Sequence, residues 1–189
     1  MKKIFFSFLC VAAFTLTGYS QIGFKAGVNF ANQTTESGGI SFSPSAITSL
    51  VLGVNYNAAI SESLALRPGL SYSTKGSKIE FLGIESKGTF NYLEIPVDLV
   101  FGSGNFTFHG GPYIGMLLSA SDSDGNDISE ESKSTDFGLN LGVQYSFSQI
   151  GVGAQYGFGI SNIAEDDPTI MDEFKVTNRV LSIYLTYTL

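Results

Sequence analysis

The stretch from Asn91 to Phe101, NYLEIPVDLVF, decides how the rest of the chain is interpreted. Every second residue from Leu93 onward is apolar, while Glu94, Pro96 and Asp98 share the positions between them. A period of two residues is typical of a β-strand whose two faces meet different surroundings. The position of this strand in the fold therefore depends on which medium lies on each side of it.

The same alternation recurs along the chain, and the part after residue 20 shows no sustained helical period. It predicts eight strands, over residues 22–30, 46–60, 64–75, 88–101, 106–119, 135–147, 150–161 and 175–189. The short connections are 61–63, 102–105 and 148–149, and the long ones are 31–45, 76–87, 120–134 and 162–174. Tight turns at one end and long loops at the other are typical of an outer-membrane barrel.

Two kinds of eight-stranded barrel fit this alternation. A soluble barrel points its apolar face inward, whereas a transmembrane barrel points it toward lipid. The polar face is poor in charge and rich in glycine, as at Gly138, Gly142 and Gly153. Glycine weakens a water-exposed strand, but small residues suit the crowded interior of eight strands. The sequence therefore predicts an all-β fold, an eight-stranded antiparallel up-and-down transmembrane β-barrel with a packed polar lumen.

The first residues have the pattern of an export signal, because Lys2 and Lys3 precede an apolar stretch and a small polar segment. We expect a signal peptide over 1–20 and one outer-membrane β-barrel domain over 21–189. The single cysteine, Cys10, lies within this signal, so no thiol remains for a disulfide or a metal site. Without the signal, 8 basic residues stand against 17 acidic ones, a net charge of −9. This balance disfavours nucleic acid as a partner.

Five polar side chains are expected to point into the lumen and to form a polar cluster. They are Lys25, Arg67, Glu94, Asp98 and His109. If residues 102–105 form the whole turn, residue 101 pairs with 106, and Asp98 faces His109 directly. The cluster is then either a structural plug of mutually satisfied charges or a gate whose pairs exchange to open a narrow path. A catalytic Asp–His pair lacks a nearby Ser or Cys nucleophile, so the sequence predicts neither an enzyme nor a cofactor.

Two features are expected at the outer end. The acidic segment SDSDGNDISEE (121–131) has Asp127 where a calcium loop needs glycine, so we expect a solvated loop and no metal. Arg179 is expected to face outward near the end of the last strand. There it meets lipopolysaccharide phosphate or extends its charged end to the interface.

Four stretches resemble the PorT-like outer-membrane β-barrel family, and the resemblance spans essentially the whole mature chain. They are NYLEIPV (91–97), GPYIGML (111–117), TDFGLNLGV (135–143) and NRVLSIYLTYTL (178–189). The resemblance implies an outer-membrane barrel of the size of OmpA and OmpX in a Gram-negative cell, without catalytic residues. One departure is the last residue, since such chains usually end in an aromatic residue and this one ends in Leu189.

The expected function is a structural or surface-interaction role with acidic extracellular loops. The alternatives are a small-solute pore gated by lumenal charge pairs and an outer-membrane lipid-modifying enzyme. The expected partners are the lipid bilayer, lipopolysaccharide and the barrel-insertion machinery. The protein is expected to be a monomer in the outer membrane.

Overall fold

The computed structural model describes residues 21–81, 83–164 and 175–189, so the expected signal peptide over 1–20 lies outside the described residues. The described chain is almost entirely β-structure. Its elements are β1 (Gln21–Ser37), β2 (Ile40–Phe42), β3 (Ser45–Ala59), β4 (Leu64–Phe81), β5 (Ile84–Ser103), β6 (Phe106–Ser121), a 3-10 turn η1 (Ser129–Glu131), β7 (Thr135–Phe147), β8 (Ile150–Gly159) and β9 (Lys175–Thr188). Among the described residues, no helix is long and apolar enough to cross a membrane.

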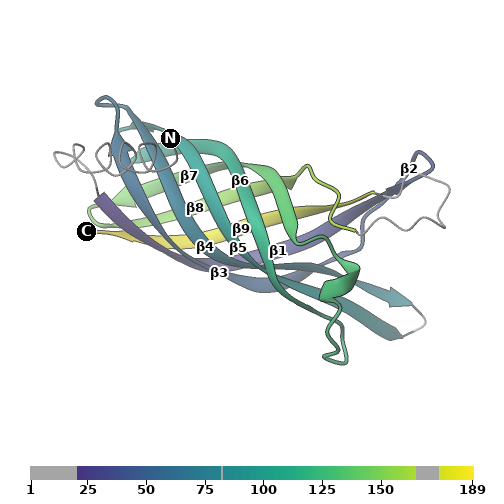
Figure 1. The fold of residues 1–189 in the computed structure, drawn as a ribbon. Helices are drawn as coiled ribbons and strands as arrows, with labels where there is room; N and C mark the ends of the chain where they lie inside the picture. The colour runs from purple at the N-terminus through teal and green to yellow at the C-terminus, as the bar shows by residue number, and fades with distance from the viewer. Residues whose placement is uncertain (1–20, 82, 165–174) are drawn as a thin grey trace, which may run out of the picture.

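Eight long strands form one closed antiparallel barrel, because each pairs with its neighbours in sequence and β9 pairs back to β1. β2 is not part of the wall, since it is three residues long and pairs with the outer end of β1. Figure 1 shows the long strands wound side by side, with the start of β1 and the end of β9 at the same end. Closure leaves no strand edge open to hydrocarbon. The prediction of an eight-stranded up-and-down barrel is confirmed.

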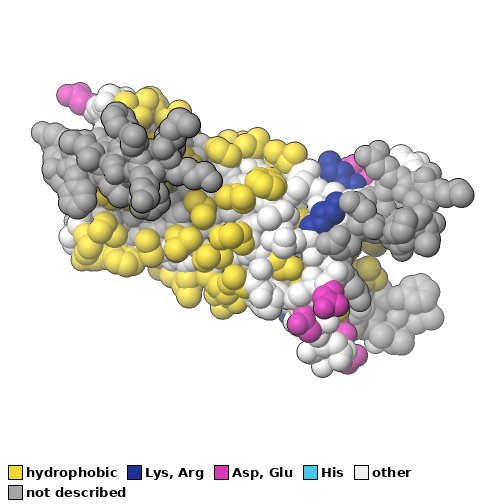
Figure 2. All heavy atoms as spheres, in the orientation of Figure 1, with side chains coloured by type: hydrophobic (Ala, Val, Ile, Leu, Met, Phe, Trp, Pro, Cys, Tyr) yellow, Lys and Arg dark blue, Asp and Glu magenta, His cyan; other side chains and the backbone are white. Residues whose placement is uncertain are grey.

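The two faces of the wall carry opposite kinds of side chain. Leu52, Leu141 and Leu185 lie in mid-strand and are nevertheless 52%, 59% and 60% exposed. Lys75 and Asp136, by contrast, are 2% and 0% exposed. On the face shown in Figure 2, apolar side chains cover the barrel wall, and most of the visible charged ones lie beyond one end of it. A soluble barrel would show the reverse arrangement, so the apolar face is the lipid-facing one.

Two hairpins extend farther than the sequence pattern predicted. β4 and β5 stay paired as far as the last residue of β4 and the first residue of β5. The prediction of a long loop over 76–87 is therefore wrong. β1 likewise runs on to Ser37, and β2 turns back after Gly38 and Gly39, whose φ angles are 56° and 80°. Glycine adopts such angles without steric cost. Beyond the bilayer both faces of a strand meet water, so the two-faced alternation fades although the strands continue.

The connection between β5 and β6 is shorter than expected. Ser103 pairs with Phe106 across a two-residue turn, 104–105, whose glycine has a φ of 59°. The expected pairing of 101 with 106 is therefore wrong. His109 pairs with Val100 instead of lying directly opposite Asp98.

Candidate functional site in the barrel lumen

The polar residues predicted for the lumen fall into two groups at different depths. Lys25, Arg67, Asp98 and His109 line one small cavity, together with Tyr184. We call these five residues the periplasmic layer, because they lie toward the tight turns, which face the periplasm in outer-membrane barrels. The predicted fifth member, Glu94, does not line that cavity. It belongs to an outer layer, which comprises Lys75, Tyr92, Glu94, Tyr113, Asp136 and Asn178.

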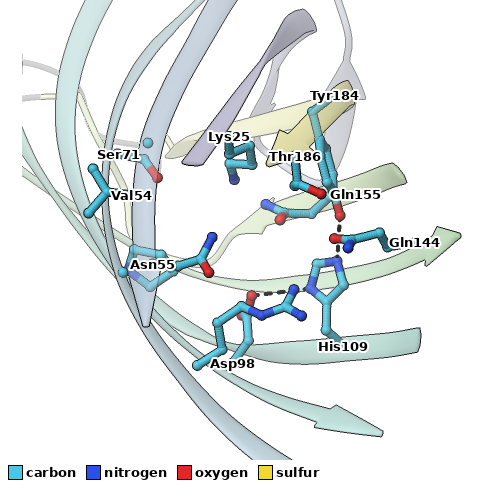
Figure 3. A pocket seen from close by; sticks show the side chains of 14 residues that line it. Lys25, Val54, Asn55, Ser71, Asp98, His109, Gln144, Gln155, Tyr184 and Thr186 are labelled. Carbon is cyan, nitrogen blue, oxygen red and sulfur yellow. Dashed lines mark hydrogen bonds and ion pairs between the residues drawn. The ribbon is translucent and has the colours of Figure 1, made fainter. Parts of the chain in front are cut away.

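A chain of three side chains forms the centre of the periplasmic layer. His109 Nδ1 lies 3.1 Å from Asp98 Oδ2, and His109 Nε2 lies 2.9 Å from the Tyr184 hydroxyl. Figure 3 shows the three in line, with Gln144 and Gln155 beside the His109–Tyr184 contact. Asp98 and His109 are thus in contact, as predicted, but across a diagonal of the β5–β6 pair. Both ring nitrogens of His109 have partners, so the imidazole is fixed in place.

The two cations of this layer are less fully paired. Arg67 Nε donates to Asn57 Oδ1 at 2.6 Å. Lys25 Nζ lies 5.3 Å from the centre of the Tyr184 ring, a cation–π distance. Within the described residues, no further hydrogen bond or ion pair is formed by Lys25 Nζ or by the Arg67 terminal nitrogens. The unused donors face the interior of the barrel.

Glycines in the wall make room for the rings of this layer. A Cβ atom on Gly153 would lie 2.5 Å from Cζ of Tyr184, and one on Gly142 would overlap the His109 ring. These positions face the lumen, where the sequence pattern placed them. Glycine here allows close packing, which is why it is tolerated in mid-strand.

The outer layer is built around Lys75, which joins two carboxylates. Its Nζ lies 2.6 Å from Glu94 Oε1 and 2.9 Å from Asp136 Oδ2. The Glu94 contact is an ion pair without directed hydrogen-bond geometry. Asp136 Oδ2 also accepts from the Tyr113 hydroxyl at 3.2 Å and from Asn178 Nδ2 at 2.9 Å. Strands β4, β5, β6, β7 and β9 are therefore joined by one buried polar cluster.

Sequence reasoning gave Glu94 the wrong partners and omitted Lys75 and Asp136 from the cluster. Glu94 was expected in one cluster with the cations Lys25 and Arg67, but Lys75 is the cation that forms an ion pair with it. The signal for Asp136 was available, because it lies on the same parity as the inward residues that follow it on β7. Parity gives the face of a residue and not its depth, so the pairing across the barrel could not be read from it.

The periplasmic layer holds little free space between its side chains. The cavity in the periplasmic layer has a volume of about 20 Å³, and a site for one water needs roughly 10–15 Å³. Among the described residues, no group of three or more His, Cys, Asp or Glu side chains is placed to hold a metal ion. The arrangement is therefore suited to closing the barrel.

The outer end carries the acidic segment and Arg179. Asp122 accepts hydrogen bonds from the side-chain amide and the backbone N–H of Asn126 and from the backbone N–H of Asp124, at 2.8–2.9 Å. The Asn126 side-chain bond is the main cause that holds the pKa of the Asp122 carboxyl below its ordinary value. Arg179 Nη1 donates to the carbonyl oxygens of Gly159 and Asn178, at 2.6 and 3.0 Å.

Comparison with known proteins gives a family and a fold. A family model described as an outer membrane protein beta-barrel domain matches residues 12–165. No curated protein sequence matches the chain. Among solved structures, the attachment invasion locus protein Ail of Yersinia pestis is 16% identical, with a TM-score of 0.54 over 90% of this chain and 99% of that one. Neisserial surface protein A is 15% identical, with a TM-score of 0.56 over 87% and 96% of the two chains.

At these identities the likeness shows the fold alone. The outer membrane protease OmpT of Escherichia coli is also similar, at 11% identity, but its TM-score of 0.45 is too low to bear on activity.

Proposed function

The chain belongs to the family of outer-membrane β-barrel domains, and from that premise we propose that it is a non-enzymatic barrel with a sealed lumen. Its role is to hold the outward hairpins in fixed positions for contacts at the cell surface. The observation that carries this proposal is the filling of the lumen by two successive polar layers. A free path for solutes would have to pass both.

The charges of the two layers support a closed state, because they balance. Three cations face three carboxylates: Lys25, Arg67 and Lys75 against Glu94, Asp98 and Asp136. Removing one partner from a buried ion pair costs about 3–5 kcal/mol. Opening the outer layer would separate Lys75 from two carboxylates at once, so spontaneous opening is disfavoured.

Planar-bilayer recording tests the seal and separates it from the pore alternative. The refolded protein should give no steady current, with only rare, short openings. A variant in which Lys75, Glu94 and Asp136 are all replaced by alanine removes the charged side chains of the outer layer and serves as the matched comparison. Steady open-channel current through the unmodified protein would refute the sealed barrel and favour a small-solute pore.

The outward hairpins offer the surface for the second part of the proposal. Ile40 and Phe42 on β2 are 76% and 55% exposed, and in Figure 1 β2 lies at the far end of the molecule from the tight turns. Neighbouring apolar side chains that are exposed to water mark interaction sites more often than apolar residues scattered singly over a surface do. Cells that display an Ile40→Ser, Phe42→Ser variant should lose surface adhesion while the barrel still folds. Unchanged adhesion would contradict this role.

The narrower expectations from the sequence are kept as proposals. The PorT-like resemblance, lipopolysaccharide contact at Arg179 and recognition by the insertion machinery each rest on sequence features alone. Exchange of Leu189 for Phe tests the last of these, because a faster insertion rate in vesicles with purified machinery would show that the terminal residue is read. An unchanged rate would show that it is not.

A further inference from the structure

A second, larger cavity opens at the end of the barrel that carries the tight turns. It has a volume of about 340 Å³, which lies within the usual range for small-molecule sites, roughly 300–1,000 Å³. Its wall consists mostly of small or uncharged polar residues from β3 to β7, from β9 and from the turns, among them Asn57, Thr107 and Ser146. Arg67 and Glu62 are the charged members, and Glu62 is exposed. We call this cavity the periplasmic cup.

Arg67 lies where the cup meets the small cavity of the periplasmic layer, because it lines both. Its Nε–H donates a hydrogen bond to Asn57 Oδ1, which fixes the guanidinium plane. Its register partner Asp98 does not take up the remaining donors, because Asp98 Oδ2 is held by His109 and Asp98 Oδ1 has no hydrogen-bond partner. The terminal guanidinium nitrogens are left for a ligand, and their planar fork suits a carboxylate.

Gln144 supplies an independent sign of a missing ligand. It also lines both cavities, is only 7% exposed, and its Oε1 has no hydrogen-bond partner. Its Nε2 donates a hydrogen bond to Ser146 Oγ at 2.9 Å. A buried acceptor without a partner is costly and uncommon. The cup therefore presents unused donors at Arg67 and an unused acceptor at Gln144.

The charges of the lumen favour an anion at this end. In the periplasmic layer Lys25 and Arg67 share one carboxylate, Asp98, and Lys25 is also attracted by Glu94 of the outer layer. The outer layer has Lys75 against Glu94 and Asp136. The positive charge at the cup is that of Arg67, since Lys25 does not line it and Glu62 contributes an exposed carboxylate to its wall.

We propose that the periplasmic cup binds the carboxyl end of a peptide chain, with the carboxylate on Arg67 and the adjacent amide N–H directed to Gln144 Oε1. Such an end carries one anionic group and one donor within a few ångströms, which is the pair of functions that the cup leaves unused. The site is separate from the outward hairpins and does not depend on their role.

The test uses NMR of the full barrel refolded in lipid nanodiscs with arginine side chains labelled with ¹⁵N. The chain has two arginines, Arg67 and Arg179, so the spectrum carries its own control. The probe is N-acetyl-alanyl-alanine, and the comparison is the same dipeptide with a C-terminal amide. We expect a saturable shift of the Arg67 Nε–H signal by the acid, with a dissociation constant of about 1 mM, and no shift of Arg179. An equal response to the amide, or none to the acid, would overturn the proposal.

A steric variant keeps the test decisive if Arg67→Gln fails to fold. Gly102 lines the cup, and a Cβ atom there would be 3.5 Å from Thr107 Cγ2, an ordinary contact. Gly102→Leu should therefore fill the cup without disturbing the wall and should weaken binding at least tenfold. Gln149→Leu adds the same side chain at the same end outside the cup and should bind as the unmodified protein does. Equal binding by Gly102→Leu would show that the carboxylate sits elsewhere.

Discussion

Replacing Lys75 with Met tests whether the outer layer is a balanced ion cluster. Lys75 is 2% exposed, and its Nζ lies 2.6 Å from Glu94 and 2.9 Å from Asp136. Its loss leaves two buried carboxylates without a cation, for which we expect a cost of about 3–5 kcal/mol. With a urea dependence of roughly 2 kcal/mol per M, the unfolding midpoint should fall by about 1.5–2.5 M.

The assay is a urea titration in lipid vesicles, with the folded fraction read from heat-modifiable migration on a gel. The triple variant Lys75→Met, Glu94→Gln, Asp136→Asn removes the charges together and should recover most of the loss. Lys175→Met changes a lysine outside the lumen and should alter stability by less than about 0.5 kcal/mol. A midpoint for Lys75→Met within roughly 0.5 M of the unmodified protein, or a triple variant as unstable as the single one, would refute the reasoning.

Two further comparisons use the same titration. Leu141→Lys in the lipid-facing belt should lower the free energy of unfolding by about 2–4 kcal/mol. Ile40→Lys changes an equally apolar and more exposed residue of the outer hairpin and should be nearly neutral. Equal effects of the two variants would contradict the position of the belt. Gly153→Ala should cost about 1–3 kcal/mol because its Cβ would lie 2.5 Å from Tyr184. Gly102→Ala makes only an ordinary contact, 3.5 Å from Thr107 Cγ2, and should be neutral or slightly stabilising. A neutral Gly153→Ala would show that the ring does not pack there.

The wall of the barrel could be predicted because lipid and a packed lumen impose opposite polarity on successive residues. Leu141 and Asn140 illustrate this, since the first is 59% exposed to the belt and the second is 4% exposed in the lumen. The pattern failed where both faces of a strand meet water, as in the β4–β5 hairpin over 76–87. Strand ends beyond the bilayer are set by pairing with the neighbouring strand, which a single segment does not encode.

The lumenal site could be predicted in part for a related reason. Parity put Asp98 and His109 on the inward face and in contact, and the structure agrees. The pairing of Lys75 on β4 with Asp136 on β7 depends on the stagger between strands that are not neighbours. The register offsets of successive strand pairs add up to that stagger. An error of two residues at turn 104–105 is therefore enough to displace a predicted partner.

The seam between β1 and β9 has a consequence for how the protein is made. Ser182 Oγ donates to Asn29 Oδ1 at 2.7 Å across this seam, between segments near opposite ends of the chain. Before β9 is available, β1 and β8 would each present a row of bare backbone donors and acceptors, which hydrocarbon does not tolerate. A half-built wall therefore has no stable place in the bilayer. Pairing of β9 with β1 completes the ring, so membrane entry becomes an all-or-nothing event that waits for β9.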